Sequence, residues 1–193
     1  MTPGPEFEAL MREVRSGDER AAATLVRDFE PFVRRDLRFR LRDERARRLI
    51  DSMDVCQSVL ASFFVRAAAG QFDLREPKDL LNLLISMARN KLAKQLQSQR
   101  RQRRDSRRTV GGVEDLALAQ PLPTPSQIVS GKELLEEVSR RLDDEERRLA
   151  ELRVQGQSWD EIAAALGGTA EARRKQLARA MDRVTAELRL DET

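Results

Sequence analysis

Apolar residues recur every three or four positions along much of this chain, which is the spacing of one buried face on an α-helix. In the first half this pattern predicts helices around Phe7–Val14 and Ala22–Phe29. Pro31 predicts the start of a third helix, because proline suits a first helical turn. A helix over 51–69 and a long helix opened by Pro77 follow. The inward-facing residues of the third helix are expected to be Phe32, Val33, Leu37 and Leu41.

Short helices with clear start and stop signals fill the second half. Ser126 is expected to begin one helix. Asp143 and Glu146 form a capping box for the next helix, in which each residue's side chain bonds the other's backbone amide. That helix ends at Gly156, and its expected buried residues are Leu149, Leu152 and Val154.

Residues 158–181 have the pattern of a helix-turn-helix. Ser158 and Glu161 form a second capping box, and Gly167-Gly168 ends that helix because glycine adopts the left-handed conformation without a Cβ clash. Thr169 is a ready N-cap for the following helix. Two short helices joined by a tight, glycine-containing turn are typical of DNA-binding proteins whose second helix enters the major groove.

The outward face of this second helix is basic. Arg174, Lys175 and Arg179 are its candidate DNA contacts, because cations bind phosphates and arginine also reads guanine edges. An ordinary helical hairpin with a solvated charged face is the alternative. Arg173 falls where an apolar residue is expected, so it should extend to solvent or form an ion pair.

Composition excludes several function classes. The 193 residues include no histidine and one cysteine, which removes His-based triads and His- or Cys-pair metal sites. We therefore expect no catalytic residues, no metal and no cofactor, and a buried free thiol at Cys56. No apolar run approaches the ~20 residues of a membrane span, and no signal peptide is evident. A soluble, cytoplasmic protein without membrane insertion is the expectation.

Charge is unevenly distributed although the net charge is only +3. Residues 34–48 hold eight arginines against three acids, which either a solvated face or contact with a nucleic-acid backbone would explain. Residues 89–108 hold nine cations and one acid, an excess that favours contact with a polyanion. Glycines and prolines over 106–125 then predict a flexible linker between helical domains at 1–105 and 126–193.

Distinctive segments along the chain are DSMDVCQSV over 51–59, Phe72 with the leucine run that follows, MARNKL over 87–92, LDDEERRLAELR over 142–153 and GQSWDEIAAALG over 156–167. Taken together, these segments resemble the extracytoplasmic-function (ECF) type of RNA polymerase sigma factor, in the sigma-70 family. They lie in the family's order and cover nearly the whole chain. The chain departs from the family at Ser58, where an acidic residue is common, and at Arg173, where an apolar residue is common.

The resemblance implies two partners, core RNA polymerase and promoter DNA, with an anti-sigma protein as a further candidate. The 51–69 helix would dock on the clamp of the largest polymerase subunit, and the second half on the flap of the second largest. The implied docking residues are Asp54, Gln57, Ser58 and Ala61, with Arg66 nearby. Residues implied to capture and flank the −10 bases are Phe72, Met87, Asn90, Lys91, Lys94, Arg100 and Arg101. Residues implied to read the −35 element are Thr169, Arg174, Lys175 and Arg179.

Two other functions fit parts of the pattern. A stand-alone helix-turn-helix regulator would bind duplex DNA without polymerase. A helical RNA-binding or scaffold protein would bind no promoter at all. The need for core polymerase distinguishes a sigma factor from both.

Overall fold

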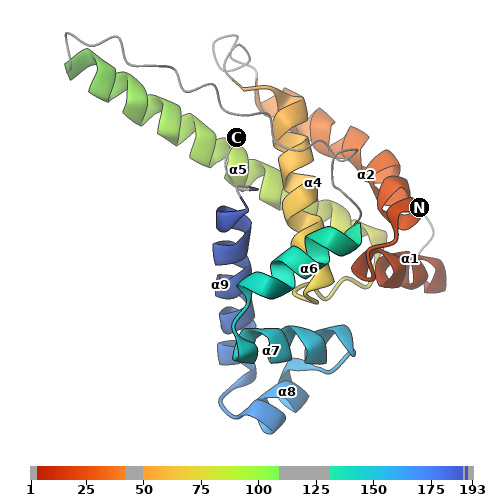
Figure 1. The fold of residues 1–193 in the computed structure, drawn as a ribbon. Coiled ribbons are helices and arrows are strands. Elements are labelled where there is room, and N and C mark those ends of the chain that lie inside the picture. Colours follow the sequence, from red (N-terminus) through yellow and green to blue (C-terminus); the bar gives the residue numbers. More distant parts are fainter. Residues whose placement is uncertain (1–3, 42–49, 109–130, 189, 191–193) are drawn as a thin grey trace.

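The computed structural model describes residues 4–41, 50–108, 131–188 and 190, while the side chains of Arg100, 102–108 and 131–133 lie outside that description. The described part is all-helical, as predicted, and contains no strand. Its helices, shown in Figure 1, are α1 (Pro5–Arg15), α2 (Glu19–Arg40), α4 (Ser52–Ala68), α5 (Pro77–Arg108), α6 (Gly131–Arg141), α7 (Asp144–Val154), α8 (Trp159–Leu166) and α9 (Ala170–Glu187).

The first four helices enclose one hydrophobic core. Each helix contributes one apolar stripe, and α4 packs between α2 and α5 with two of its faces buried. The most enclosed side chains of this core include Met11, Leu25, Leu37, Leu60, Phe63, Leu80 and Leu84. The helix α5 continues past the other helices at its C-terminal end (Figure 1).

The prediction that Pro31 begins a helix is wrong, because α2 is continuous from Glu19 to Arg40 with Pro31 inside it. A proline in a helix interior costs ~3 kcal/mol through its missing amide donor and its ring. The buried stripe of α2, which runs through Phe29 and Val33 on both sides of the proline, offsets that cost. The prediction that Phe32 faces inward is also wrong, since Phe32 lies on the outer side of α2 and is 38% exposed.

The helices α6 to α9 form a second hydrophobic cluster around Leu149, Ile162, Leu177 and Met181. The predicted capping boxes at Asp143–Glu146 and Ser158–Glu161 are both present. The prediction that Val154 is buried is wrong. Val154 is the last residue of α7 and is 52% exposed, because Leu149, Ala150 and Leu152 already fill the inner face of that short helix.

The predicted linker over 106–125 falls mainly outside the described residues, as does the predicted helix start at Ser126. The helix α5 runs on to Arg108, so the first residues of that predicted linker are helical. Among the helices described, none combines the length and the hydrophobicity that crossing a membrane would require.

Candidate nucleic-acid and partner interfaces

The turn between α8 and α9 is built from its local sequence. Gly167 and Gly168 have φ angles of 80° and 82°, which L-residues with a Cβ rarely adopt. The Thr169 side chain then accepts a hydrogen bond from the Ala172 amide at 3.1 Å and caps α9. Arg173 secures the end of α8 by donating to the carbonyls of Leu166 at 2.5 Å and Gly167 at 2.9 Å. This turn orients α9 relative to α8.

Arg173 forms an ion pair, which is one of the two arrangements that the sequence predicted for it. Its guanidinium contacts the Glu145 carboxylate at 2.5 Å, and this hydrogen bond lowers the pKa of Glu145. Glu145 belongs to the first turn of α7, so the arginine joins α7, α8 and α9. It stabilises the helix-turn-helix from within and is not part of the basic outer face.

The basic outer face of α9 is exposed. Arg174, Lys175 and Arg179 all face solvent, while Leu177, Ala180 and Met181 on the opposite side are buried. Lys175 forms an ion pair with Glu171 one turn earlier, at 2.6 Å. This exposed pair lies on the surface, where such pairs contribute little to stability and exchange readily for other partners.

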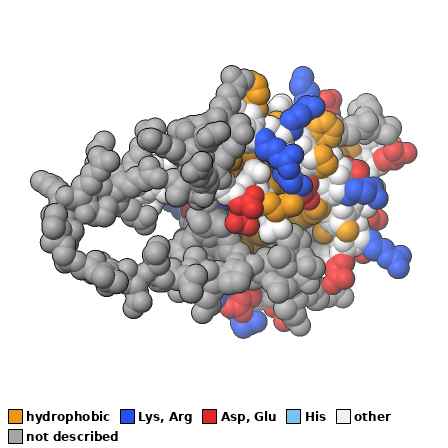
Figure 2. Space-filling view, turned by 90° about the horizontal axis from the view of Figure 1, so that it is seen from above, with side chains coloured by type: hydrophobic (Ala, Val, Ile, Leu, Met, Phe, Trp, Pro, Cys, Tyr) orange, Lys and Arg blue, Asp and Glu red, His pale blue; other side chains and the backbone are white. Residues whose placement is uncertain are grey.

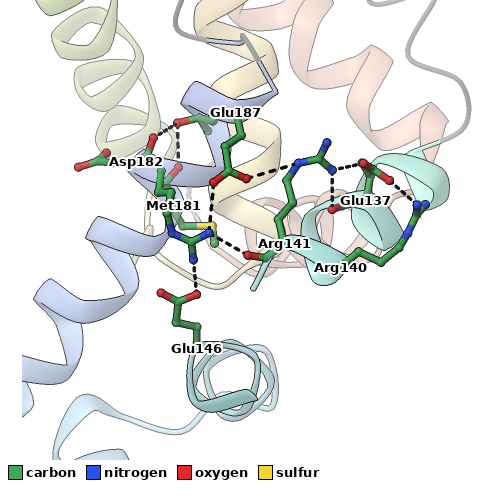
Figure 3. A network of polar contacts seen from close by, with 9 residues as sticks. Glu137, Arg140, Arg141, Glu146, Met181, Asp182 and Glu187 are labelled. Atoms are coloured by element: carbon green, nitrogen blue, oxygen red, sulfur yellow. Dashed lines mark hydrogen bonds and ion pairs between the residues drawn. The ribbon is translucent and has the colours of Figure 1, made fainter. Parts of the chain in front are cut away.

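A polar network fixes the far half of α9 against α6 and α7 (Figure 3). The Arg183 guanidinium contacts Glu146 at 2.5 Å and Glu187 at 3.4 Å, and it donates to the Arg141 carbonyl at 2.9 Å. These carboxylates raise the pKa of Arg183, with Glu146 making the largest contribution. Arg141 in turn contacts Glu137 and Glu187. This network engages Arg183, whereas Arg174, Lys175 and Arg179 of α9 stay exposed to solvent.

The basic run of α5 has two kinds of environment. Lys94 and Arg101 are exposed, as phosphate contacts require. Lys91 is only 8% exposed, because its ammonium lies against Ser58 and donates to the Leu190 carbonyl at 2.8 Å. Figure 2 shows the molecule from above, with Lys and Arg side chains next to hydrophobic and acidic ones on the described part of that surface. Within the basic run of α5, the described exposed cations include Lys94 and Arg101, whereas Lys91 is buried.

The residues predicted for a −10 base pocket differ in exposure. The ring of Phe72 stacks on Phe63 with 5.8 Å between centroids, so one side of it belongs to the core. The Phe72 carbonyl accepts a hydrogen bond from Arg15 at 3.2 Å. Met87 is partly buried and Asn90 is exposed. That these three residues hold a base together stays a prediction.

The predicted docking face of α4 is only partly open. Asp54 is exposed and Gln57 is half-buried. Ser58 and Ala61 are 3% and 9% exposed, because α6, α9 and the chain near Leu190 lie on them. The outer surface of α4 is therefore an intramolecular contact in this conformation.

A cluster that the sequence did not indicate joins the two halves of the chain. Arg153 of α7 forms an ion pair with Asp73, donates to the Gly70 carbonyl at 3.2 Å, and lies over the Trp159 ring at 4.4 Å. The Trp159 indole donates to the same Asp73 carboxylate at 3.3 Å. The one available signal was an arginine directly after Leu152, on the buried side of a short amphipathic helix.

A basic helix-turn-helix together with a second basic helix is typical of DNA-binding proteins. A family model described as ECF sigma factor matches residues 5–190, and this chain belongs to that family. No curated protein and no solved structure matched the chain. ECF sigma factors are transcription regulators without enzymatic activity, and they direct promoter-specific initiation together with RNA polymerase. RNA polymerase and promoter DNA are therefore this chain's partners.

Proposed function

We propose that this protein binds core RNA polymerase through α4, reads the −35 element as duplex DNA through α9, and captures −10 bases beside α5. The observation that carries the proposal is the arrangement of α9. Its apolar side is buried, Arg173 and Arg183 are held by internal partners, and Arg174, Lys175 and Arg179 remain exposed on one face.

Duplex recognition follows from that arrangement. A capped helix N-terminus directs amides toward phosphates, and arginine and lysine side chains reach base edges in the major groove. Thr169 at the N-cap and Arg174 one turn into α9 suit these two contacts. Lys175 and Arg179 would bind the adjacent phosphates.

Strand opening at −10 needs no covalent chemistry. Extruding a base from the stack costs a few kcal/mol, and a pocket with an aromatic ring and polar groups offsets that cost by binding the free base. Phe72, Met87 and Asn90 would form this pocket. Lys94, Arg100 and Arg101 would bind the flanking phosphates, while Lys91 becomes available only when its ammonium leaves Leu190.

Polymerase docking is tested by reversing the exposed charge at Asp54. Asp54→Arg and Gln57→Ala should weaken association with purified core polymerase at least tenfold, because both residues would face the clamp. Asp28→Arg is the matched control, since Asp28 is exposed on α2 and pairs only with its neighbour Arg27 in the described contacts. If the Asp54 variant binds core polymerase as the control does, α4 is not the docking helix.

A further inference from the structure

The C-terminal half of the chain packs on the same α4 face that is proposed to dock polymerase. Ala61 and Val65 of α4, and Ala69 directly after it, belong to one hydrophobic cluster with Val138 of α6 and Met181 of α9. All five residues are at most 9% exposed. A partner helix cannot contact this part of α4 while α6 and α9 cover it.

Polar contacts near the end of the chain extend this cover. The Ser58 hydroxyl donates to the Leu190 carbonyl at 2.5 Å, and the Lys91 ammonium donates to the same oxygen at 2.8 Å. The Leu190 amide bonds back to Thr185 at 2.9 Å, which holds this carbonyl in place. A residue proposed for polymerase docking and a residue proposed for DNA binding thus share one acceptor.

Two ion pairs join the halves near the C-terminal end of α4. Arg66, in the last turn of α4, contacts Asp182 of α9 at 2.8 Å and also donates to Thr185 at 3.1 Å. Just after α4 ends, Asp73 pairs with Arg153 of α7. In both pairs the arginine side chain is largely buried, at 11% and 7% exposure, whereas the acid is exposed.

The backbone at Gly70 permits the second of these contacts. Gly70 ends α4 with a φ of +69°, and a Cβ at this position would lie 2.7 Å from the Cβ of Arg153. That spacing is too short for any other residue type without a shift of α7. The absence of a side chain at Gly70 therefore allows α7 to approach the end of α4.

From these contacts we propose that the free protein is autoinhibited: its C-terminal half covers the polymerase-docking face of α4 and retains Lys91, and polymerase binds only after the halves separate. The inference rests on the proposed docking role of α4. The interface mixes small apolar residues with exposed acids, which is typical of contacts within a chain that can open. If most molecules are closed, the apparent affinity for polymerase equals the affinity of the open form multiplied by the fraction of molecules that are open.

The test reverses the exposed acid of each ion pair in the 193-residue protein. Asp73→Arg and Asp182→Arg each place a cation beside a buried arginine, and neither residue is a proposed polymerase or DNA contact. Asp28→Arg has the same charge change away from the interface and serves as the control. Small-angle X-ray scattering measures the radius of gyration, acrylamide quenching measures the exposure of Trp159, the single tryptophan, and circular dichroism confirms helix content.

Both interface variants should have a larger radius of gyration and bind core polymerase roughly three- to tenfold more tightly than the wild type and the control. Variants that open but bind core polymerase no better overturn the inference and leave the proposed function intact. Scattering that is unchanged in both variants also overturns it, because the ion pairs then do not hold the halves together. If none of the four proteins binds core polymerase, the proposed function fails and the inference fails with it.

Discussion

Asp36 of α2 accepts a hydrogen bond from Arg89 of α5, with 3.0 Å between Oδ1 and Nη2. Arg40 on the same helix donates to its other oxygen at 2.8 Å. These bonds lower the pKa of the Asp36 carboxyl, with Arg89 making the largest contribution. The pair joins two helices of the first core and neutralises one cation of the basic run in α5.

This pair predicts a pH-dependent contribution to stability. Because the folded-state pKa of Asp36 lies below the ordinary 3.8, its stabilisation is fully present above that value and is lost as the pH falls through the lower folded value. Asp36→Asn should therefore lower the free energy of unfolding more at about pH 7 than at about pH 2. Urea unfolding at both pH values checks this, with Asp28→Asn as the control. An equal loss at both pH values would contradict it.

The capping box at Ser158 predicts a local stability effect. Ser158→Ala should lower the free energy of unfolding by about 1 kcal/mol, because the Glu161 amide loses its side-chain acceptor. Denaturation followed by Trp159 fluorescence reports this half of the chain directly. Ser98→Ala, at an exposed position within α5, is the matched control and should have little effect. A cap variant no less stable than this control would refute the expectation.

Substitutions at Arg174 and Lys175 should have different effects on DNA binding. Arg174→Ala is expected to reduce discrimination at one −35 base pair by about 1–3 kcal/mol, as the loss of a bidentate base contact does. Lys175→Ala should weaken binding to all sequences and reduce the slope of log K against log salt by about 1. Holoenzyme binding to a set of −35 variants at several salt concentrations measures both effects. Arg148→Ala, an exposed arginine of α7, should change neither.

Lys94 should contribute a phosphate contact at the −10 element. Lys94→Ala is predicted to reduce the salt dependence of holoenzyme binding to forked promoter DNA by about 0.7, the value for one contact with a single strand. Lys78→Ala, at an exposed lysine in the first turn of α5, is the control. A salt slope that is the same for both variants would remove Lys94 from the proposed site.

Cys56 should be unreactive in the folded protein. Its side chain is fully buried on α4, and burial raises the pKa of its thiol from 9.0 to about 12. A thiol reagent should therefore label it slowly under native conditions and rapidly in denaturant. The raised pKa also predicts that stability is lost as the pH rises from about 9 toward 12, because the unfolded thiol ionises first. Labelling of the native protein at the unfolded rate would contradict this burial.

Local signals predicted most of the helix ends. The capping boxes at Ser158 and Asp143 and the glycines at 167 and 168 specify their turns through contacts within a few residues, so the sequence suffices. Pro31 misled the prediction because its own preference is local, whereas the packing of Phe29 and Val33 that keeps α2 continuous is tertiary.

Contacts between the two halves could not be predicted from the sequence. An amphipathic pattern identifies the face of a helix that is buried but not the element that buries it. The family resemblance implied that Ser58 and Ala61 dock on polymerase, yet the segments that cover them here come from the same chain. Arg153 and Asp73 are 80 positions apart, and neither lies in a motif that indicates the other.

Run-off transcription with purified core polymerase and a cognate promoter template tests the central claim most directly. The proposed function predicts a promoter-specific transcript only when the protein and core polymerase are both present. It also predicts that mutating the −35 element removes this transcript. Strong binding of the protein alone to the duplex promoter, together with no transcript when core polymerase is added, would contradict the claim and identify a stand-alone regulator.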